Sequence, residues 1–433
     1  MLKPSCVWSN LKGEEIMERQ TILTIYKNER GVSAILVTIL IIVILGFVAL
    51  ALDTSHLVVA RNELQNAADA GALAGARYLY NDEGTLVNEG ANQIAYNAAT
   101  ANKSEKVAVE VNWTAPNSGD VLRGHWSFGY GSLARGFYVS NNTSAPELWD
   151  HSTVELDEDP NFVNAVQVTT RRETTPILAL FARIFNIDSF QLTADAVAWI
   201  GFAGTLEPFD VDQPIAICAE SLLINGEYSC SIGRMINSGQ NIESSETGGW
   251  TSFNQDDPCS GGTNAQEVKS LVCKSGNPES IQLGGDMATN GGEIQSAFSE
   301  LLDCWNEHIA NDGPVPWNLT LPVVSCPGNN VGTCEIVKGA VNLNIIWITE
   351  AGEDPGYNDA PTQMGDWSSD NPDGQVRWNE FTQVFNLQNV DGSPAPYAKK
   401  SIYFLPDCTP HIPTGGSGGE NFGVLAKYPK LVE

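Results

Sequence analysis

An uninterrupted apolar segment near the N-terminus constrains this chain more than any other feature. Residues 32–52 contain no charged side chain, and their only polar residues are Ser33 and Thr38. A helix of this length is roughly 31 Å long at ~1.5 Å per residue, which matches the ~30 Å hydrocarbon core of a bilayer. A buried helix of a soluble protein is the alternative, but such a helix usually has a polar face. We therefore predict one transmembrane helix.

The charges beside this segment predict its orientation. Lys27 and Arg30 precede the segment, and Asp53 follows it. Because basic residues remain on the cytoplasmic side, we expect a cytoplasmic N-terminus and an exported C-terminal part. The apolar run exceeds the ~7–15 residues of a cleaved signal peptide, so we expect it to be retained as an anchor. Met1 and Met17 are both open as the start of the chain.

The cysteines predict an oxidising environment for the exported part. Cys6 precedes the apolar segment, and the other eight cysteines lie in the second half of the chain. An even number on one side of a membrane is typical of disulfides, and the absence of a Cys-x-x-Cys pair disfavours a zinc site. The expected pairs are 218–230, 259–273, 326–334 and 304–408. The predicted disulfide residues are Cys218, Cys230, Cys259, Cys273, Cys304, Cys326, Cys334 and Cys408.

The net charge limits the partners of the chain. With 23 Lys and Arg against 52 Asp and Glu, the net charge is -29. Such an acidic surface repels phosphate backbones, so we expect no nucleic-acid partner. Solubility is the simplest role of this charge.

A proline-free segment follows the apolar one and predicts that the helix continues to Tyr80. Apolar and small residues recur there at spacings of three and four, and two glycines form a Gly-x-x-x-Gly pattern that permits close helix packing. This face either packs on its own domain or mediates self-association or docking on a partner helix. The residues of the face are Leu57, Ala60, Leu64, Ala67, Gly71, Ala74, Gly75 and Tyr78.

The segment from Glu29 to Leu79 resembles the N-terminal part of the TadE/TadG-like tight-adherence proteins. The resemblance is carried by Arg30-Gly31, by the span that ends in Leu52-Asp53, and by Arg61 followed by Leu64–Ala70. The regions 164–198 and 319–433 also resemble Tad-like proteins. The resemblance implies a protein of the bacterial inner membrane, with its C-terminal part periplasmic or extracytoplasmic. Its implied partners are the lipid bilayer, pilins, and the machinery of pilus assembly or secretion.

Two departures from the family pattern refine this resemblance. Pilin-like members that are processed usually carry a Glu five residues after the cleaved Gly, and here Leu36 stands five residues after Gly31. The resemblance therefore implies the TadG-type anchored component. Many TadG relatives carry a von Willebrand A module with an Asp-x-Ser-x-Ser loop. The segment Asp366–Asp370 ends in Asp and follows no apolar strand, so we expect no such module.

The periodicity beyond the anchor predicts an α+β fold in two exported domains. We expect a small α+β domain first, then a Gly- and Cys-rich domain that is mostly β. The predicted units are 1–31 (cytoplasmic), 32–52 (transmembrane), 53–80 (extended helix), 81–201 and 202–433. The first domain is expected to hold helices at 86–101 and after Pro176, and strands at 107–113, 126–130, 163–170 and 190–200. The second is expected to hold strands at 214–218, 319–324, 341–349 and 400–405 and a helix at 294–309.

Two short motifs suggest chemistry. The segment 369–380 is similar to the calcium-binding loop of an EF-hand. It has oxygen ligands, a turn glycine and a final Glu, as calcium requires, but it begins with Ser and has no entering helix. The alternative is a solvated acidic turn that starts a helix near Arg377. Gly415–Gly419 matches the Gly-x-Ser-x-Gly hydrolase pattern, but nearby prolines predict a flexible loop. The residues of the calcium hypothesis are Ser369, Asn371, Asp373, Gly374, Val376 and Glu380.

These observations favour a non-enzymatic, membrane-anchored component of Flp pilus assembly, with no cofactor unless calcium binds. The alternative is a surface adhesin or binding module, either anchored or released, whose binding depends on calcium in one version.

Overall fold

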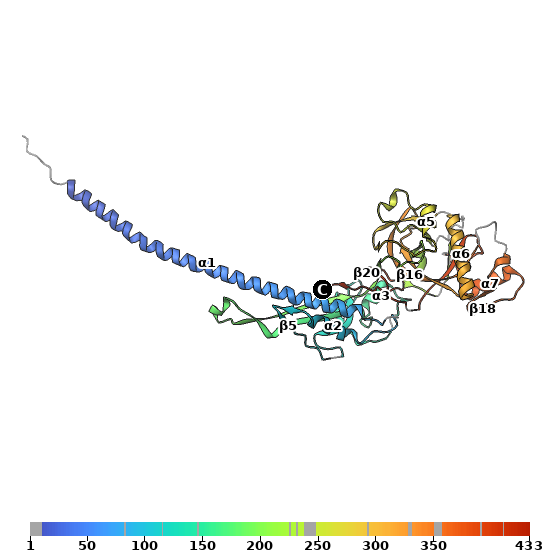
Figure 1. Ribbon diagram of the computed structural model, residues 1–433, viewed down its shortest axis with the longest axis horizontal. Helices are drawn as coiled ribbons and strands as arrows, with labels where there is room; N and C mark the ends of the chain where they lie inside the picture. Colours follow the sequence, from blue (N-terminus) through green and yellow to red (C-terminus); the bar gives the residue numbers. More distant parts are fainter. Residues whose placement is uncertain are drawn as a thin grey trace, which may run out of the picture.

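The computed structural model consists of one long N-terminal helix followed by two sheet-based parts arranged along one axis (Figure 1). It confirms the predicted mixture of helix and sheet. For residues 11–32 only the backbone is described. The described residues are 11–81, 84–114, 116–144, 147–224, 227–230, 233–237, 248–291, 294–327, 331–349, 357–389, 392–409 and 411–433.

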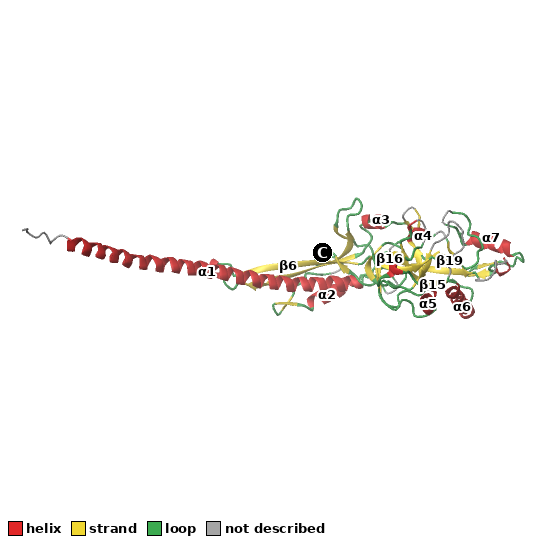
Figure 2. Ribbon diagram, turned by 90° about the horizontal axis from the view of Figure 1, so that it is seen from above, coloured by secondary structure: helices red, strands yellow, loops and turns green. Residues whose placement is uncertain are grey.

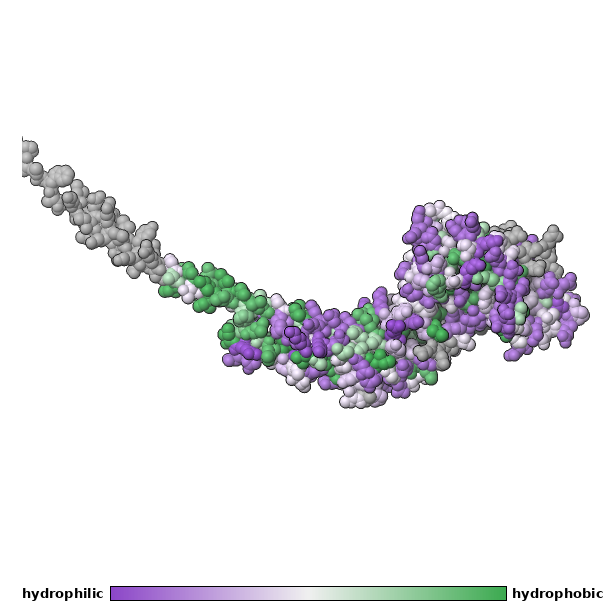
Figure 3. Space-filling view, viewed as in Figure 1, coloured by the Kyte–Doolittle hydropathy of each residue, from purple (hydrophilic) through white to green (hydrophobic). Residues whose placement is uncertain are grey.

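The long helix α1 spans Leu11–Arg77, which is 67 residues. At ~1.5 Å per residue it is roughly 100 Å long. From Ser33 to Leu52 every side chain except that of Ala49 is exposed, although nearly all are apolar, and they form the green surface in Figure 3. Beyond residue 59 one face of the same helix becomes buried. The helix ends three residues before Tyr80, the predicted end.

We call the sheet-based part next to the apolar segment of α1 membrane-proximal and the other part membrane-distal. The membrane-proximal part is a five-stranded antiparallel sheet covered by two helices. The strand order is β21-β6-β5-β3-β4, and the end of α1 packs with α2 against the sheet through a core rich in alanine. In Figure 2 the strand β6 runs beside α1. The elements are α2 (Ala91–Thr100), β3 (Val121–Ser127), β4 (Gly136–Val139), α3 (Thr153–Glu158), β5 (Ala165–Leu178), β6 (Ser189–Trp199) and β21 (Lys430–Leu431).

The last strand of this sheet comes from the far end of the sequence. Lys430 and Leu431 pair with Trp199 and Ala198 at the edge of β6. The sequence boundary at 201–202 separates these segments, and no local pattern indicated that they meet.

Two predicted elements of the membrane-proximal part are wrong. The expected strand 107–113 is reduced to β2 (Val107–Ala108), which pairs with β1 (Lys103–Ser104). The expected helix after Pro176 is instead the end of β5, followed by a single 3-10 turn, η1 (Ala182–Phe185). The Glu110 carboxylate accepts hydrogen bonds from the N–H groups of residues 173–175, which holds a bulge in β5. Proline is tolerated next to a bulge because no ladder hydrogen bond is lost there.

The membrane-distal part is built on a seven-stranded sheet in the order β11-β19-β16-β14-β12-β8-β15. Because β15 also pairs with β16, five of these strands close into a ring. The predicted strands 214–218, 319–324, 341–349 and 400–405 correspond to β8, β15, β16 and β19. The strands are β8 (Ile215–Cys218), β11 (Arg234–Asn237), β12 (Gly248–Thr251), β14 (Asp286–Asn290), β15 (Trp317–Val324), β16 (Cys334–Ile348) and β19 (Ser401–Pro406).

Helices and short ribbons cover this ring. The predicted helix 294–309 is α6 (Gln295–Asp312), which packs Phe298, Leu301 and Trp305 into the largest apolar core. A three-stranded sheet, β13-β7-β20, lies between the two parts. The remaining elements are β7 (Phe202–Leu206), α4 (Ala219–Leu222), β9 (Leu223–Ile224), β10 (Glu227–Tyr228), η2 (Pro258–Ser260), α5 (Ala265–Leu271), β13 (Ile281–Gln282), η4 (Tyr357–Asp359), β17 (Gln363–Met364), β18 (Trp367–Ser368), α7 (Gly374–Val384) and β20 (Gly416–Gly419).

Four disulfides join the eight cysteines of the membrane-distal part, as predicted, but all four expected pairings are wrong. Strand register rather than sequence distance brings the cysteines together. For example, β8 and β15 run in parallel and place Cys218 opposite Val324. Cys326 is two residues after Val324 in the sequence and therefore lies close to Cys218. The disulfides are Cys218–Cys326, Cys230–Cys408, Cys259–Cys334 and Cys273–Cys304.

Candidate functional site: the anchor helix and its junction with the domain

Helix α1 carries two surfaces in succession, one exposed and apolar and one buried. Among the described residues it is the one helix that is long and apolar enough to cross a membrane, and none of the side chains in its most apolar window is buried in the protein. A candidate span therefore leads directly into a helix that packs on a folded domain. No loop separates the two.

The structure places the predicted helix-packing residues unevenly on the buried face. Leu57 and Ala74 are half-buried, and Tyr78 is exposed. An α-helix turns once every 3.6 residues, so a strict heptad drifts off a face that the domain covers. Toward the end of the helix the buried face also includes residues 68, 72 and 76, and Leu79 continues it just after the helix. The predicted residues that are buried are Ala60, Leu64, Ala67, Gly71 and Gly75.

The Gly-x-x-x-Gly pair lies against the chain's own domain. A Cβ atom on Gly71 would lie 2.9 Å from the Cβ of Ala99. A Cβ atom on Gly75 would lie 2.8 Å from the Cβ of Ala95 and 2.9 Å from a methyl group of Val166. Both positions therefore require glycine, because α2 and β5 approach the backbone of α1 closely. Of the two interpretations of this face, the structure shows packing on its own domain.

Side-chain hydrogen bonds hold the helix between residues 60 and 65. The hydroxyl of Thr170 on β5 donates to the carbonyl of Leu64 at 2.8 Å, and the hydroxyl of Ser104 donates to the carbonyl of Ala60 at 3.1 Å. Gln65 donates from its amide to the carbonyl of Asp195 on β6 at 2.9 Å. The hairpin formed by β5 and β6 therefore runs beside α1 and holds it at several levels.

Asp53 forms the junction between the apolar segment and the folded part. Its carboxylate is buried and accepts hydrogen bonds from the N–H groups of Leu180 at 2.9 Å, Phe181 at 3.1 Å and Ala182 at 2.6 Å. Burial raises the pKa of Asp53, but these N–H groups outweigh burial and hold the pKa below its ordinary value. From the sequence, Asp53 was only the polar residue that ends the apolar segment. Nothing in the sequence indicated a partner more than 120 residues away.

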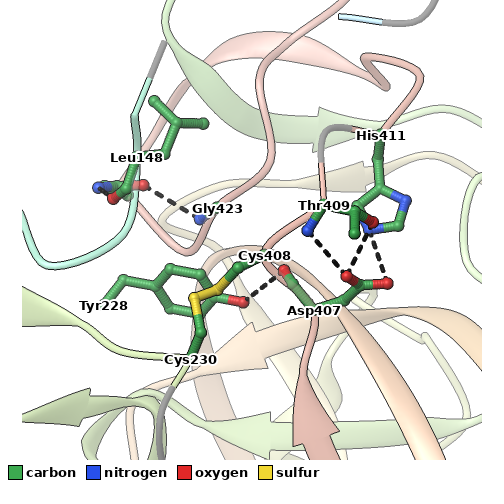
Figure 4. The surroundings of a disulfide bond; sticks show 9 residues. Leu148, Tyr228, Cys230, Asp407, Cys408, Thr409, His411 and Gly423 are labelled. Atoms are coloured by element: carbon green, nitrogen blue, oxygen red, sulfur yellow. Dashed lines mark hydrogen bonds and ion pairs between the residues drawn. A yellow bond between two sulfur atoms is a disulfide. The ribbon is translucent and has the colours of Figure 1, made fainter. Parts of the chain in front are cut away.

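A second polar cluster lies beside the Cys230–Cys408 disulfide (Figure 4). The ring of His411 points toward Asp407, with Nε2 at 3.1 Å from a carboxylate oxygen. The N–H and hydroxyl of Thr409 both donate to the other carboxylate oxygen at 2.9 Å. Burial raises the pKa of Asp407, but the hydrogen bonds from His411 and Thr409 outweigh it and lower the pKa to about 2.

This cluster is not arranged for nucleophilic catalysis. The hydroxyl nearest the Asp407–His411 pair, that of Thr409, donates to the carboxylate and not to the imidazole. The hydroxyl of Tyr228 donates to the backbone carbonyl of Asp407 at 3.1 Å, and burial raises its pKa. The cluster fixes the end of β19 beside β10, as the disulfide also does.

The EF-hand-like segment serves as the start of a helix. Asp373 caps α7 by accepting the N–H of Gln375 at 2.9 Å, so the helix begins at Gly374, three residues before the expected start. The hydroxyl of Ser369 donates to the Glu380 carboxylate at 2.5 Å. A Cβ atom on Gly374 would lie 1.7 Å from the carbonyl oxygen of Tyr357, so packing alone accounts for the glycine.

The other members of the segment serve the same turn. Asn371 accepts the N–H of Asp373 through its side chain, and Val376 is partly exposed. Arg377 is buried and donates to the carbonyl groups of Asn371 and Asn358. These contacts agree with the acidic-turn alternative, and calcium binding stays a hypothesis.

Elsewhere in the described part, one group of three side chains has metal-ligand spacing. It consists of Cys259, Asp286 and Cys334, but the two cysteines are joined in a disulfide and cannot act as thiolate ligands. Residues 416–419 of the Gly-x-Ser-x-Gly segment form the strand β20 and not a flexible loop, so that prediction is wrong. The hydroxyl of Ser417 donates to the carbonyl of Tyr428 at 2.9 Å, and no helix follows it as a nucleophile elbow requires.

Comparison with family models gives two adjoining matches. Residues 31–77 match the family described as putative Flp pilus-assembly TadE/G-like. Residues 74–198 match the family described as putative Tad-like Flp pilus-assembly. The matches cover α1 from the apolar segment onward and the membrane-proximal sheet through β6. They end before residue 319, so they do not support the resemblance that we saw in the C-terminal region. No curated protein and no solved structure matches the chain.

Proposed function

We propose that this chain, which is a TadG-type Tad protein with a role related to Flp pilus assembly, is a non-enzymatic component anchored in the inner membrane. The observation that carries the proposal is the continuity of α1. One helix leads from an exposed apolar segment to a face that is buried in the domain. Any movement of the anchor is therefore transmitted to the domain without an intervening linker.

The proposed orientation places the N-terminus in the cytoplasm and the folded parts in the periplasm. Lys27 and Arg30 precede the span, which favours a cytoplasmic N-terminus. The four disulfides favour an oxidising compartment for the membrane-distal part. The two arguments are independent, and they agree.

A mechanical role fits the way in which the polar side chains are used. Asp53 holds the hairpin turn, the Asp407–His411 pair fixes a strand end, and Ser417 bonds to the backbone. In the described part of the chain, these groups stabilise the fold and do not converge on a reactive centre. We therefore propose that the chain presents a rigid, acidic domain to pilins or to other proteins of the assembly machinery.

Deletion of the gene in a piliated host tests this function. We expect surface pili to be lost, and we expect the full chain to restore them. The chain itself should remain in the membrane fraction. Normal piliation after deletion would contradict the proposal. If pili stayed normal and only surface attachment were lost, the adhesin alternative would be favoured.

A reporter enzyme fused after Glu433 tests the orientation separately. An enzyme that is active only outside the cytoplasm, such as a periplasmic phosphatase, should be active in this fusion. Activity of a reporter that works only in the cytoplasm would overturn the orientation.

A further inference from the structure

The turn between β5 and β6 exposes an unusual concentration of apolar side chains. Ile184 is 76% exposed and Phe185 is 77% exposed, which matches Phe47 in the candidate span at 70%. Soluble surfaces rarely expose such side chains next to one another, and contiguous apolar patches usually mark an interaction site. The exposed apolar residues of this hairpin tip, residues 178–187, are Leu178, Leu180, Phe181, Ile184, Phe185 and Ile187.

The hairpin tip lies beside the end of the apolar segment of α1. Asp53, the first residue after that segment, accepts the N–H groups of Leu180, Phe181 and Ala182. In Figure 1 the tip is the part of the folded region that extends furthest back along α1 toward the N-terminus. In Figure 3 the green surface of the helix continues onto the adjoining region. The apolar surfaces of the tip and the anchor are therefore continuous.

Most backbone N–H groups of the tip donate hydrogen bonds to acceptors within the protein and not to water. Ala179 donates its N–H to the carbonyl of Asp188, and Asp53 accepts the next three N–H groups. Within the turn, the N–H groups of residues 184, 186 and 187 donate to carbonyls of residues 181–183. A segment that enters a membrane must satisfy its backbone donors internally, because lipid tails offer no acceptors. Seven of the ten backbone N–H groups of residues 178–187 therefore have these acceptors within the protein.

The one basic side chain of the tip fits a membrane surface. Arg183 is exposed between the apolar residues of the turn. An arginine at such a position can bury its carbon chain at the interface and place its guanidinium among phosphate groups. The tip itself contains no acidic residue, and the acidic residues that border it are Asp188, the next residue in the sequence, and Asp53, whose carboxylate accepts its N–H groups.

We propose that this hairpin tip inserts into the interfacial layer of the membrane that α1 crosses, as a second contact with the lipid. This inference rests on the proposed anchoring by α1. The bilayer is the occupant that the structure favours, because the patch is continuous with the lipid-facing surface of the anchor. With two contacts, the domain has a fixed height and tilt relative to the membrane, which one helix alone does not give.

Photocrosslinking of the full chain in vesicles of phosphatidylethanolamine and phosphatidylglycerol tests the inference. The photoreactive amino acid benzoylphenylalanine is placed, one position at a time, at Ile184, Phe185, Phe47 and Tyr130. Tyr130 is the matched control, because it is 63% exposed on the same domain. It stacks on Phe128, which contacts Trp199 at the end of β6 opposite the hairpin tip. Mass spectrometry then measures lipid attached to the protein. All four positions are exposed, so the replacements leave the fold intact.

We expect positions 184 and 185 to yield as much lipid adduct as position 47, and we expect no lipid adduct at position 130. Adducts at position 47 without any at 184 and 185 would overturn the inference and leave the anchor intact. Adducts at 184 or 185 to a second copy of the chain would also overturn it, in favour of a protein contact. No lipid adduct at position 47 would contradict the anchoring itself, and with it the proposed function.

Discussion

The membrane-proximal part contains no cysteine and packs α1 on its sheet through alanine and glycine, whereas the membrane-distal part contains eight cysteines and closes five strands into a ring. In the proximal part, small side chains let two helices and a sheet approach closely. In the distal part, short strands and long connections are joined by disulfides that link segments 31 to 178 residues apart. The comparison shows that one chain can be stabilised by close packing in the part beside the apolar segment and by covalent links in the other part.

Removal of one disulfide should have the largest effect and should be confined to the distal part. The pair of substitutions Cys218→Ala and Cys326→Ala opens a link across 108 residues. We expect a loss of about 4 kcal/mol in the free energy of unfolding of the distal part, mainly because the unfolded chain gains freedom. Thermal unfolding followed by proteolysis and mass spectrometry would assign the change to a region. Equal destabilisation of the proximal sheet would contradict the comparison.

Gly75→Leu should destabilise the proximal part and leave the disulfides formed. A side chain there would meet Ala95 and Val166 at less than 3 Å, and overpacking of this kind costs about 2–3 kcal/mol. Gly46→Leu is the matched control, since no atom lies within 4 Å of a Cβ at that position. Thermal unfolding of the detergent-solubilised chain measures both variants. Similar melting temperatures for the two would show that α1 is not packed on the domain.

Asp53→Asn should loosen the hairpin tip without unfolding either part. The variant replaces the charged carboxylate, which accepts hydrogen bonds from three N–H groups, with a neutral amide. The amides of residues 180–182 should therefore exchange with deuterium faster. Asp188→Asn, an exposed neighbour on the same hairpin, should leave this exchange unchanged.

The same junction should respond to pH in a defined direction. Because the folded pKa of Asp53 is lowered, its contribution to stability is complete above the ordinary carboxyl pKa and is lost as the pH falls through the folded pKa. Protection of these three amides should therefore be constant near neutral pH and should fall only in acid. Greater protection in acid would contradict this assignment.

Asp373→Ala should have the smallest effect. It removes the cap of α7 and should cost about 1 kcal/mol in the free energy of unfolding of the distal part. Asp370→Ala, which removes an exposed carboxylate from the same turn, serves as the control. We expect calcium to leave the melting temperature of the unmodified chain unchanged, because Asp373 and Glu380 already accept hydrogen bonds. A rise that Asp373→Ala abolishes would instead support the EF-hand-like hypothesis.

The sequence predicted features that depend on local pattern. The apolar segment, the helix α6 and the strands β8, β15, β16 and β19 each follow from periodicity or composition within a short window. The pairing of the cysteines could not be predicted, because it depends on which strands are neighbours. The extension of β5 past Pro176 depends on the carboxylate of Glu110, which lies more than 60 residues earlier in the sequence.

The candidate site shows the same division. The small residues of α1 were evident from their spacing, but the face that the domain covers is not a strict heptad and passes from residue 60 to residue 79. The role of Asp53 was not evident, because the sequence around a carboxylate that follows an apolar segment does not identify the distant turn that it binds. The apolar residues of the hairpin tip were visible in the sequence, and we assigned this segment to a short helix after Pro176.

The pairing of Lys430 with Trp199 has a consequence for the order of events during biogenesis. The outer edge of β6 stays without its neighbour until residues 202–429 have been translated. The five-stranded sheet is thus among the last elements to be completed, although its other four strands are synthesised first. A chain halted before residue 430 would expose this short sheet edge at Ala198 and Trp199, where quality-control proteases could recognise it.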